Sequence, residues 1–467
     1  MRCGRILVGA AGLALAGCSV VGPAYTPPVA EVPSTWSNLA RGVSADAAGD
    51  LARWWTRFDD PILAQLIAEA REANPDLASV RTRLVQARAR RTIAAAARFP
   101  DVSSTAGARR TRTSEATTGF YSAGFDAGWE VDVFGGVRRS VEAAEADLDA
   151  TLEDVRDAHV TLAAEVARLY IEARGLTRRL AIARDNLQSQ DETLELTAWR
   201  AEAGLVSSQD VDQARANVEQ TRALIPALQT SLAATLHALD VLVGQAPGTL
   251  RARLGEDVEL PAIPATIAVG IPADALRQRP DVRAAERTLA AETARVGVAQ
   301  AARYPAFNLS GSIGVEALSA SALGDSGAWA ASIFAGVVAP IFDAGRLRAQ
   351  VEIQDAVRER AEIAYRQTVL GALEDVENAL VALVQTRERE AALVRAGEAA
   401  RSAAALARQR YSVGLIDFQS VLDTERSVLA IEDSLAATRT DGVLALIRLY
   451  KALGGGWPPE PSAGEDA

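Results

Sequence analysis

The sequence predicts a mostly helical protein with a smaller β-barrel part, duplicated within one chain and assembled from several copies into a tube. Three observations support this class. First, 49% of the 467 residues are hydrophobic but only 5% are aromatic, and the abundant Ala and Leu favour helices. Second, long stretches with heptad spacing alternate with segments of period two. Third, motifs recur at an offset of about 205 to 210 residues, which indicates an internal repeat.

The composition argues against several functional classes. The formal net charge is −11 and the isoelectric point is about 5.0, which is unfavourable for binding nucleic-acid phosphates. The two histidines, His159 and His237, are far apart in the sequence and no cysteine cluster accompanies them, so we expect no metal site. Paired carboxylates such as Asp59 and Asp60 could act as acid and base, but adjacent acids of this kind are ordinary surface residues. We therefore expect neither an enzyme nor a bound cofactor.

The N-terminus has the features of a signal peptide over residues 1–17. Arg2 and Arg5 precede an apolar run that is too short to span a membrane. The run ends in Leu15-Ala16-Gly17-Cys18, which resembles a bacterial lipobox. We expect a lipoprotein cleaved before Cys18, with a diacylglycerol on its thiol and a palmitoyl group on its amine. The alternative is an ordinary signal peptide with an unrelated cysteine. Residues 18–60 would then be a lipidated, extended segment.

An internal duplication organises the rest of the chain. The motif Asn74-Pro75-Asp76 recurs as Arg279-Pro280-Asp281, an offset of 205 (279 − 74). Later, Ala203-Gly204-Leu205 recurs as Val413-Gly414-Leu415, an offset of 210 (413 − 203). Two ordered matches at nearly one offset indicate a repeat. We expect a first repeat over residues 61–244, a connector over 245–269, a second repeat over 270–454 and a tail over 455–467.

Each repeat is predicted to contain a helix, two strands, a very long helix, a tight turn and a returning helix. Apolar residues follow a heptad pattern from Leu152 to Leu194, which is typical of long helices that pack along a seam. At 1.5 Å per residue, a helix over 137–200 is about 95 Å long and must belong to a rod or tube. The predicted elements are strands near 102–134, 307–316 and 329–342, long helices 137–200 and 345–411, turns 203–207 and 413–417, and returning helices 208–243 and 418–453.

The strand segments alternate between apolar and polar residues. Phe125 and Trp129 are separated by Asp126 and Gly128, a pattern typical of a strand with one lipid-facing and one wet face. Four such strands cannot close a membrane barrel, whose minimum is about eight, and lipid does not tolerate open strand edges. The chain must therefore oligomerise. Two copies would supply 4 × 2 = 8 strands and three copies 4 × 3 = 12, which is wide enough for a lumen.

Nearly the whole mature chain resembles the outer-membrane efflux channels of the TolC type, within the lipoprotein branch called NodT-like. The motifs that carry this resemblance are Cys18-Ser19-Val20-Val21-Gly22-Pro23-Ala24-Tyr25, Trp54-Trp55, Phe58-Asp59-Asp60-Pro61, Trp129-Glu130-Val131-Asp132-Val133-Phe134-Gly135, Arg279-Pro280-Asp281-Val282-Arg283 and Pro340-Ile341-Phe342-Asp343-Ala344-Gly345-Arg346.

The resemblance implies an architecture and a function. The expected assembly is a homotrimer with a twelve-stranded barrel in the outer membrane, four strands per chain, continued by a periplasmic helical coiled-coil barrel with an equatorial collar. The expected function is the exit duct of a tripartite pump that exports drugs or other toxic small molecules. Its partners would be a periplasmic adaptor (membrane fusion) protein and an inner-membrane pump of the resistance-nodulation-division class. Two alternatives are a duct for type I protein secretion and a periplasm-spanning structural lipoprotein.

The resemblance also implies two sites on the helical hairpins. The turns at Ala203, Gly204 and Leu205 and at Val413, Gly414 and Leu415 match the family's tip, where adaptor hairpins dock. The alternative for each glycine is a simple helix cap.

The second implied site is the closed periplasmic aperture near these turns. Asp423 matches an acid of the family's aperture ring, whereas Ser420 stands where a second acid is usual. Asp210 matches an acid of the first hairpin, and Asp417 is a nearby acid. Three copies of each would favour cations; the alternative is that these acids are helix caps or solvated turn residues. Arg200 and Arg410, before the two turns, are candidate partners of these acids.

Overall fold

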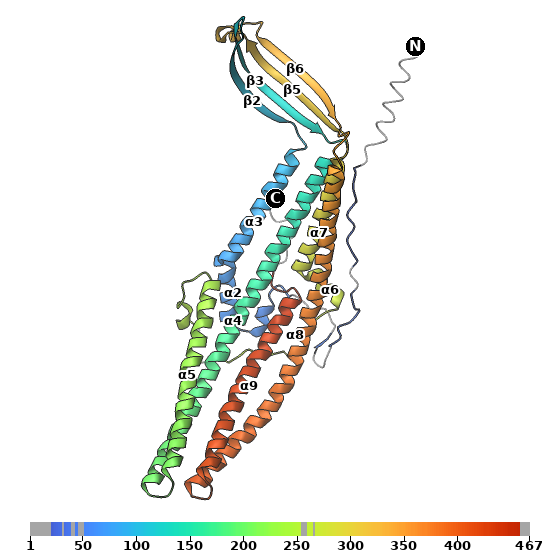
Figure 1. Ribbon diagram of the computed structural model, residues 1–467. Coiled ribbons are helices and arrows are strands. Elements are labelled where there is room, and N and C mark those ends of the chain that lie inside the picture. Colours follow the sequence, from blue (N-terminus) through green and yellow to red (C-terminus); the bar gives the residue numbers. More distant parts are fainter. Residues whose placement is uncertain are drawn as a thin grey trace. The chain divides into compact units, whose positions relative to one another are not determined.

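The structure is a computed structural model that describes residues 20–29, 32–38, 43–44, 51–253, 259–264 and 267–457 (Figure 1). The signal peptide and Cys18 lie outside these described residues, as does most of the predicted tail. The chain divides into two compact units. The first contains Thr82–Glu153 and Arg283–Thr368, and the second contains Glu31–Arg81, Asp154–Val282 and Val369–Ala467. Over the described ranges, none of the helices combines the length and apolar character needed to cross a membrane.

The first unit contains an antiparallel four-stranded sheet. Its strands are β2 (Asp101–Arg112), β3 (Thr117–Val131), β5 (Ala306–Ala317) and β6 (Trp329–Val338), in the order β2-β3-β5-β6. The β3–β5 ladder joins the two repeats. The strand predicted over 329–342 is shorter than expected and ends before Pro340, which has no N–H to donate to a ladder.

The register of the sheet separates an apolar face from a polar face. Phe125 lies opposite Ile313, which lies opposite Ala331, so an apolar row crosses three strands. On the other face, the Thr105 hydroxyl donates to Asp126 at 2.8 Å. The predicted alternation along these strands is therefore present across the sheet. Strands β2 and β6 form its two edges, each paired on one side.

The N-terminal segment in this unit is held by backbone contacts. The guanidinium of Arg139 donates to the carbonyls of Val21 and Gly22, each at 3.3 Å. A Cβ on Gly22 would lie 2.4 Å from the Cα of Gly297, so the chain passes there only with glycine at position 22, and a Cβ on Gly297 would meet the Arg139 side chain at 2.9 Å. The Tyr25 hydroxyl donates to Glu286 at 3.0 Å. These contacts hold Gly22 and Tyr25 of the N-terminal motif in place within the first unit.

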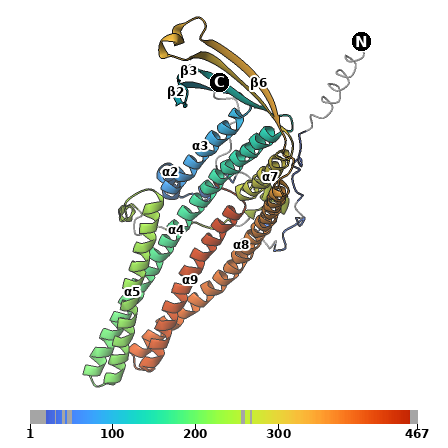
Figure 2. The same cartoon turned by 45° about the horizontal axis from the view of Figure 1, so that its top comes forward.

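Long helices form the second unit and extend into the first. The pairs are α4 (Gly136–Glu202) with α5 (Ser208–Leu242), and α8 (Arg346–Ser412) with α9 (Phe418–Ala452). Each bound lies within two residues of its predicted position. In the views of Figures 1 and 2 the two hairpins of the second unit lie side by side. The shorter helices are α2 (Pro61–Ala73), α3 (Pro75–Ala96), α6 (Pro272–Gln278) and α7 (Pro280–Ala301), and the 3-10 helices are η1 (Trp54–Phe58), η2 (Leu250–Ala252) and η3 (Ala320–Gly324).

The single helix predicted at the start of each repeat is in fact two helices. The breaks fall at Asn74 and Arg279, whose ψ angles of 124° and 119° are extended. Both residues precede a proline, and the proline ring disfavours the helical region for the residue before it. The recurring Asn-Pro-Asp and Arg-Pro-Asp motifs therefore mark helix breaks.

The main hydrophobic core of the second unit surrounds Trp54. Trp54 is fully buried and stacks on Tyr450, with ring centroids 5.3 Å apart. The connector joins this region: Ile267 in β4 (Ile267–Ala268) pairs in parallel with Val43 in β1 (Val43–Ser44). Trp36 donates its indole N–H to the Gly270 carbonyl at 3.0 Å. The N-terminal segment and the connector, predicted to form an equatorial collar, thus contact one another.

Candidate functional site

The turns that end the two hairpins have the same backbone geometry. Gly204 has φ +70° and donates its N–H to Ala201, while Leu205 donates to Arg200 at 2.8 Å. Gly414 has φ +77° and donates to Tyr411, while Leu415 donates to Arg410 at 2.9 Å. This is the Schellman motif, which requires a residue in the left-handed region and so favours glycine. Both turns fall where they were predicted.

Apolar side chains at these turns are exposed. Leu205 is 66% exposed, Val413 is 68% exposed and Leu415 is 72% exposed. Leucine and valine side chains are usually buried in a protein core. Several exposed apolar side chains together are typical of a contact surface. Ala203 offers less apolar area than Val413, so the first turn carries a smaller patch than the second.

Arg200 links the two hairpins through the backbone of the second. Its Nη1 donates to the carbonyl of Tyr411 and, at 3.2 Å, to that of Ser412. Its guanidinium also lies over the Tyr411 ring, 4.5 Å from the centroid. Arg200 therefore caps the C-terminal end of α8. In the described part of the chain it forms no ion pair with Asp210, Asp417 or Asp423, which were its candidate partners.

Asp210 and Asp417 act as helix caps. Asp210 accepts from the N–H and hydroxyl of Ser207, both at 3.0 Å, and completes a capping box at the start of α5. Asp417 accepts from the N–H and hydroxyl of Ser420 at the start of α9. These two hydrogen bonds hold the pKa of the Asp417 carboxyl below its usual value. Within one chain, both acids therefore make the contacts of helix caps, which was one of the two alternatives for them.

Asp423 is different because it is not a cap. It lies on the exposed side of α9 and accepts from Gln419, one turn earlier, at 2.9 Å. Its carboxylate is therefore free to face other groups in an assembly.

Glu425 is a functional candidate that sequence reasoning missed. It is 4% exposed, accepts from the Thr193 hydroxyl at 2.7 Å and lies 3.4 Å from Arg408. Burial raises the pKa of its carboxyl above the usual value. Residues Val421, Glu425 and Val428 follow heptad steps of four and three, so an acid at an apolar position was the available signal. It joins the two hairpins near their ends.

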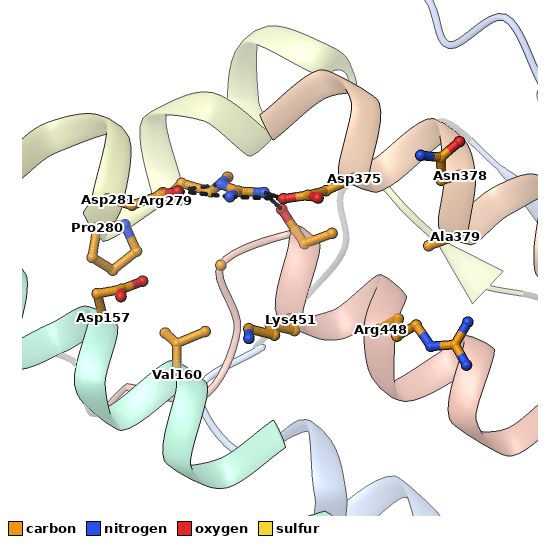
Figure 3. Close-up of a pocket in the computed structure, with 12 residues that line it drawn as sticks. Asp157, Val160, Arg279, Pro280, Asp281, Asp375, Asn378, Ala379, Arg448 and Lys451 are labelled. Carbon is orange, nitrogen blue, oxygen red and sulfur yellow. Dashed lines mark hydrogen bonds and ion pairs between the residues drawn. The ribbon is translucent and has the colours of Figure 1, made fainter. Parts of the chain in front are cut away.

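The Arg-Pro-Asp motif lines a pocket of about 260 Å³ in the second unit (Figure 3). Arg279 donates to Asp281 at 2.7 Å, to Asp375 at 3.1 Å and to the carbonyl of Ala452 at 3.0 Å. These contacts tie the α6–α7 junction to α8 and to the end of α9. The pocket also contains Lys451, the one lysine of the chain. Arg279 pairs with both Asp281 and Asp375, so the motif has a structural role here.

Neither histidine has the surroundings of a metal ligand. Burial, together with the charges of Arg71 and Arg81, lowers the pKa of His159 to about 4, so this side chain is neutral at pH 7. Across the described residues, no group of three or more histidine, cysteine or acidic side chains is arranged to hold a metal ion.

Comparison with known proteins identifies the family. The family model described as "Outer membrane efflux protein" matches residues 66–245 and 271–455, one match per repeat. The chain belongs to the outer membrane efflux protein family. It is 35% identical to Nodulation protein T of Rhizobium leguminosarum bv. trifolii over 469 residues, covering 97% of each chain. It is 34% identical to the pyoverdine export outer membrane protein OpmQ of Pseudomonas putida, covering 95% of this chain and 96% of that one.

Solved structures agree with this assignment. The outer-membrane channel OprN superposes with a TM-score of 0.89 at 37% identity, covering 94% of this efflux protein and all of OprN. The mostly helical fold with a small sheet, and the internal duplication, are thus confirmed. The protein is an outer-membrane exit duct for efflux that extends into the periplasm. Its relatives are channel proteins, which is consistent with the expectation that it is not an enzyme.

Proposed function

We propose that this exit duct works as a homotrimer within a tripartite pump. The observation that carries the proposal is the four-stranded sheet with two free edges, β2 and β6. These edge strands run in opposite directions, because each of the three ladders between them is antiparallel. Copies can therefore pair β6 with β2 in the same antiparallel manner. Three copies give twelve strands and leave no edge exposed to lipid.

We infer that the exposed hairpin ends dock a periplasmic adaptor, and that the adaptor connects the duct to an inner-membrane pump of the resistance-nodulation-division class. Leu205, Val413 and Leu415 supply apolar area on two turns of fixed backbone shape. Ala203, Gly204 and Gly414 complete these turns. A rigid turn loses little conformational entropy on binding, which favours a helical-hairpin partner.

We further propose that Asp423 lines the periplasmic aperture. Of the three candidate acids Asp210, Asp417 and Asp423, it alone caps no helix, and it is exposed. Three copies around an axis would place three carboxylates in one constriction, and such a ring attracts cations and hinders anions. Asp210 and Asp417 would add negative electrostatic potential near the aperture without contacting the passing ions. Hydrogen bonds at their helix ends hold both carboxylates in place.

Cys18 is proposed as the site of N-palmitoyl and S-diacylglyceryl groups, since the lipobox precedes it. The three acyl chains of these groups would add a lipid anchor to the barrel. The cargo is proposed to be small molecules such as drugs or other toxic compounds. Export of pyoverdine, which the name of OpmQ states, is an activity of that relative, and it supports a small-molecule cargo here.

The test is single-channel conductance of the detergent-purified protein in a planar bilayer, with native mass measured in parallel. We expect a trimeric mass and a small, cation-preferring conductance. The variant Asp423→Ala should raise the conductance and weaken the preference for cations, because it removes three charges from the constriction. The matched control is Asp212→Ala, an exposed acid on α5 that pairs with Arg215.

The outcomes separate the parts of the proposal. A monomeric mass without conductance contradicts the trimeric duct. A trimer whose conductance is the same in Asp423→Ala and Asp212→Ala keeps the duct but removes Asp423 from the aperture.

A further inference from the structure

We propose that Arg410 caps the C-terminal end of α4 in a second copy of the chain, as Arg200 caps α8 within one copy. The inference rests on the proposed trimer and assigns a residue pair to its interface: the guanidinium of Arg410 and the carbonyls of Ala201 and Glu202 of the neighbouring copy.

The contact within one chain shows what such a cap requires. Arg200 donates to the last carbonyls of α8, at Tyr411 and Ser412. The final carbonyls of a helix have no partner inside the helix and carry the negative end of its dipole. A guanidinium satisfies both needs, because it is always charged and presents several N–H groups.

The internal repeat places Arg410 in the same position as Arg200. Their separation is 210 (410 − 200), the offset that relates the two turns. In each Schellman turn the arginine carbonyl accepts from the leucine after the glycine, so both arginines lie at one point of the same motif. The backbone therefore directs the two side chains in equivalent ways.

The Arg410 side chain has no partner among the described residues of the single chain, and its predicted acceptors receive no side-chain donor there. The Ala201 carbonyl accepts the Gly204 N–H of the turn, as the Tyr411 carbonyl accepts that of Gly414. Arg410 is exposed and makes no ion pair or hydrogen bond through its side chain to the described residues. Likewise, within the described part of the chain, no side chain donates to the carbonyls of Ala201 or Glu202. The second hairpin thus carries an arginine without a partner among these residues. Over the same residues, the first hairpin carries a helix end whose carbonyls receive no side-chain hydrogen bond.

A second arginine also recurs farther from the turns, but without its acceptor, because Asp433 corresponds to Ala223 (433 − 210). Arg179 binds both carboxylate oxygens of Asp433, at 2.7 and 3.0 Å. Its repeat equivalent is Arg389 (179 + 210), which is exposed and makes no side-chain contact within the described ranges. Arg389 and Arg410 are 21 residues apart, which is three heptads, so they lie on one face of α8.

Other contacts between the hairpins are not repeated. The hydrogen bond between Thr193 and Glu425 joins the two hairpins. Their repeat equivalents are Ala403 and Arg215, which cannot form the same bond. The Tyr411 ring under Arg200 corresponds to Ala201, so the intermolecular cap would lack the ring contact. Both arginines are present in the second repeat although the other residues of this face differ. This favours a second copy as the binding partner, because that copy presents the same α4–α5 hairpin. In a closed ring of three copies, caps by Arg200 within a chain would then alternate with caps by Arg410 between chains.

The experiment is thiol cross-linking of the purified trimer. All variants carry Cys3→Ser and Cys18→Ser, so that the introduced cysteines are the only thiols of the chain. A short homobifunctional maleimide is used, because an arginine side chain separates the two backbones by more than a disulfide spans. The test pair is Arg410→Cys with Glu202→Cys, and the matched control is Arg200→Cys with Ser412→Cys. Native mass is measured for both before denaturing electrophoresis.

We expect covalent dimers and trimers from the test pair and only monomers from the control pair. A trimeric native mass with only monomers from the test pair overturns the inference and leaves the proposed trimer intact. A monomeric native mass for the protein without these pairs overturns the proposed function itself. If the test pair does not assemble, Arg410→Gln is compared with Arg348→Gln, an exposed arginine near the other end of α8. The inference requires a lower trimer-dissociation temperature in Arg410→Gln alone, and equal temperatures overturn it.

Discussion

Gly204 and Gly244 close turns of the same type at the two ends of α5, yet their surroundings differ. Both have φ near +70°, and both donate to the carbonyl three residues earlier. A Cβ added at Gly204 meets nothing within 4 Å, whereas one at Gly244 would lie 2.5 Å from the carbonyl oxygen of Ala73. At Gly204, at the hairpin end, backbone conformation alone requires glycine. At Gly244, at the other end of α5, close packing against Ala73 adds a second requirement.

The cores beside these turns differ in the same way. Near Gly244, the large cluster around Trp54 contains fully buried side chains such as Tyr170 and Leu380. Near Gly204, a small cluster around Tyr411 lies close to the buried carboxyl of Glu425. One end of the hairpin is fixed by close packing, and the other by turn geometry and polar contacts. The looser end is the one proposed to meet partners and to open.

The largest effect is expected at the packed end. Gly244→Ala should lower the free energy of unfolding by about 2 to 4 kcal/mol, because it combines left-handed strain with a backbone clash. Thermal unfolding of the detergent-solubilised protein measures it. Gly204→Ala is the matched control, with the same φ and open space. Equal losses in the two variants would mean that packing adds nothing at Gly244.

A smaller effect is expected at the hairpin ends. Gly204→Ala and Gly414→Ala should each cost about 1 to 2 kcal/mol, the strain of a left-handed non-glycine residue. We expect trimers to persist while adaptor binding weakens, since the exposed leucine beside each glycine shifts with the turn. Native mass and adaptor affinity, measured by biolayer interferometry, check both statements. Loss of the trimer instead would give these turns a purely structural role.

The smallest effect is a pH dependence that comes from Glu425. Its folded pKa lies above the unfolded value, so between these two pKa values the folded state binds more protons and stability falls as pH rises. The slope from this one group is at most about 1.4 kcal/mol per pH unit. Glu425→Gln should remove this part of the slope, measured by thermal unfolding from pH 4 upward. The exposed Glu195→Gln is the control; matching slopes in the two variants would contradict the assignment.

Much of the fold was predictable because its longest elements have the strongest periodicity. The heptads located α4, the internal repeat extended that prediction to α8, and the glycines located the turns between helices. The helix breaks at Asn74 and Arg279 were missed, although Pro75 and Pro280 carried the signal, because each motif was used only to align the repeats. The strand after Trp329 was extended too far because Ile341 continues its alternation past Pro340.

The candidate site was predictable only in part. The glycine turns and their exposed leucines follow from local sequence. The capping contacts of Asp210 and Asp417 were weighed from local spacing as one of two alternatives. The contact of Arg200 with the end of α8 joins residues 211 apart (411 − 200), and no local pattern specifies such a pairing. Glu425 was hidden because an acid within a helix normally indicates a solvated face.

The single lysine has a practical consequence. Of the 49 basic residues, Lys451 alone carries a primary amine, and it is exposed beside the pocket lined by Arg279 and Asp281. If Cys18 is acylated at its amine, the mature chain has no reactive α-amino group. An amine-directed fluorophore would then attach once per chain, next to the junction of α6 and α7. A labelled trimer would carry three chemically identical dyes at the packed end of the hairpins without any engineered residue.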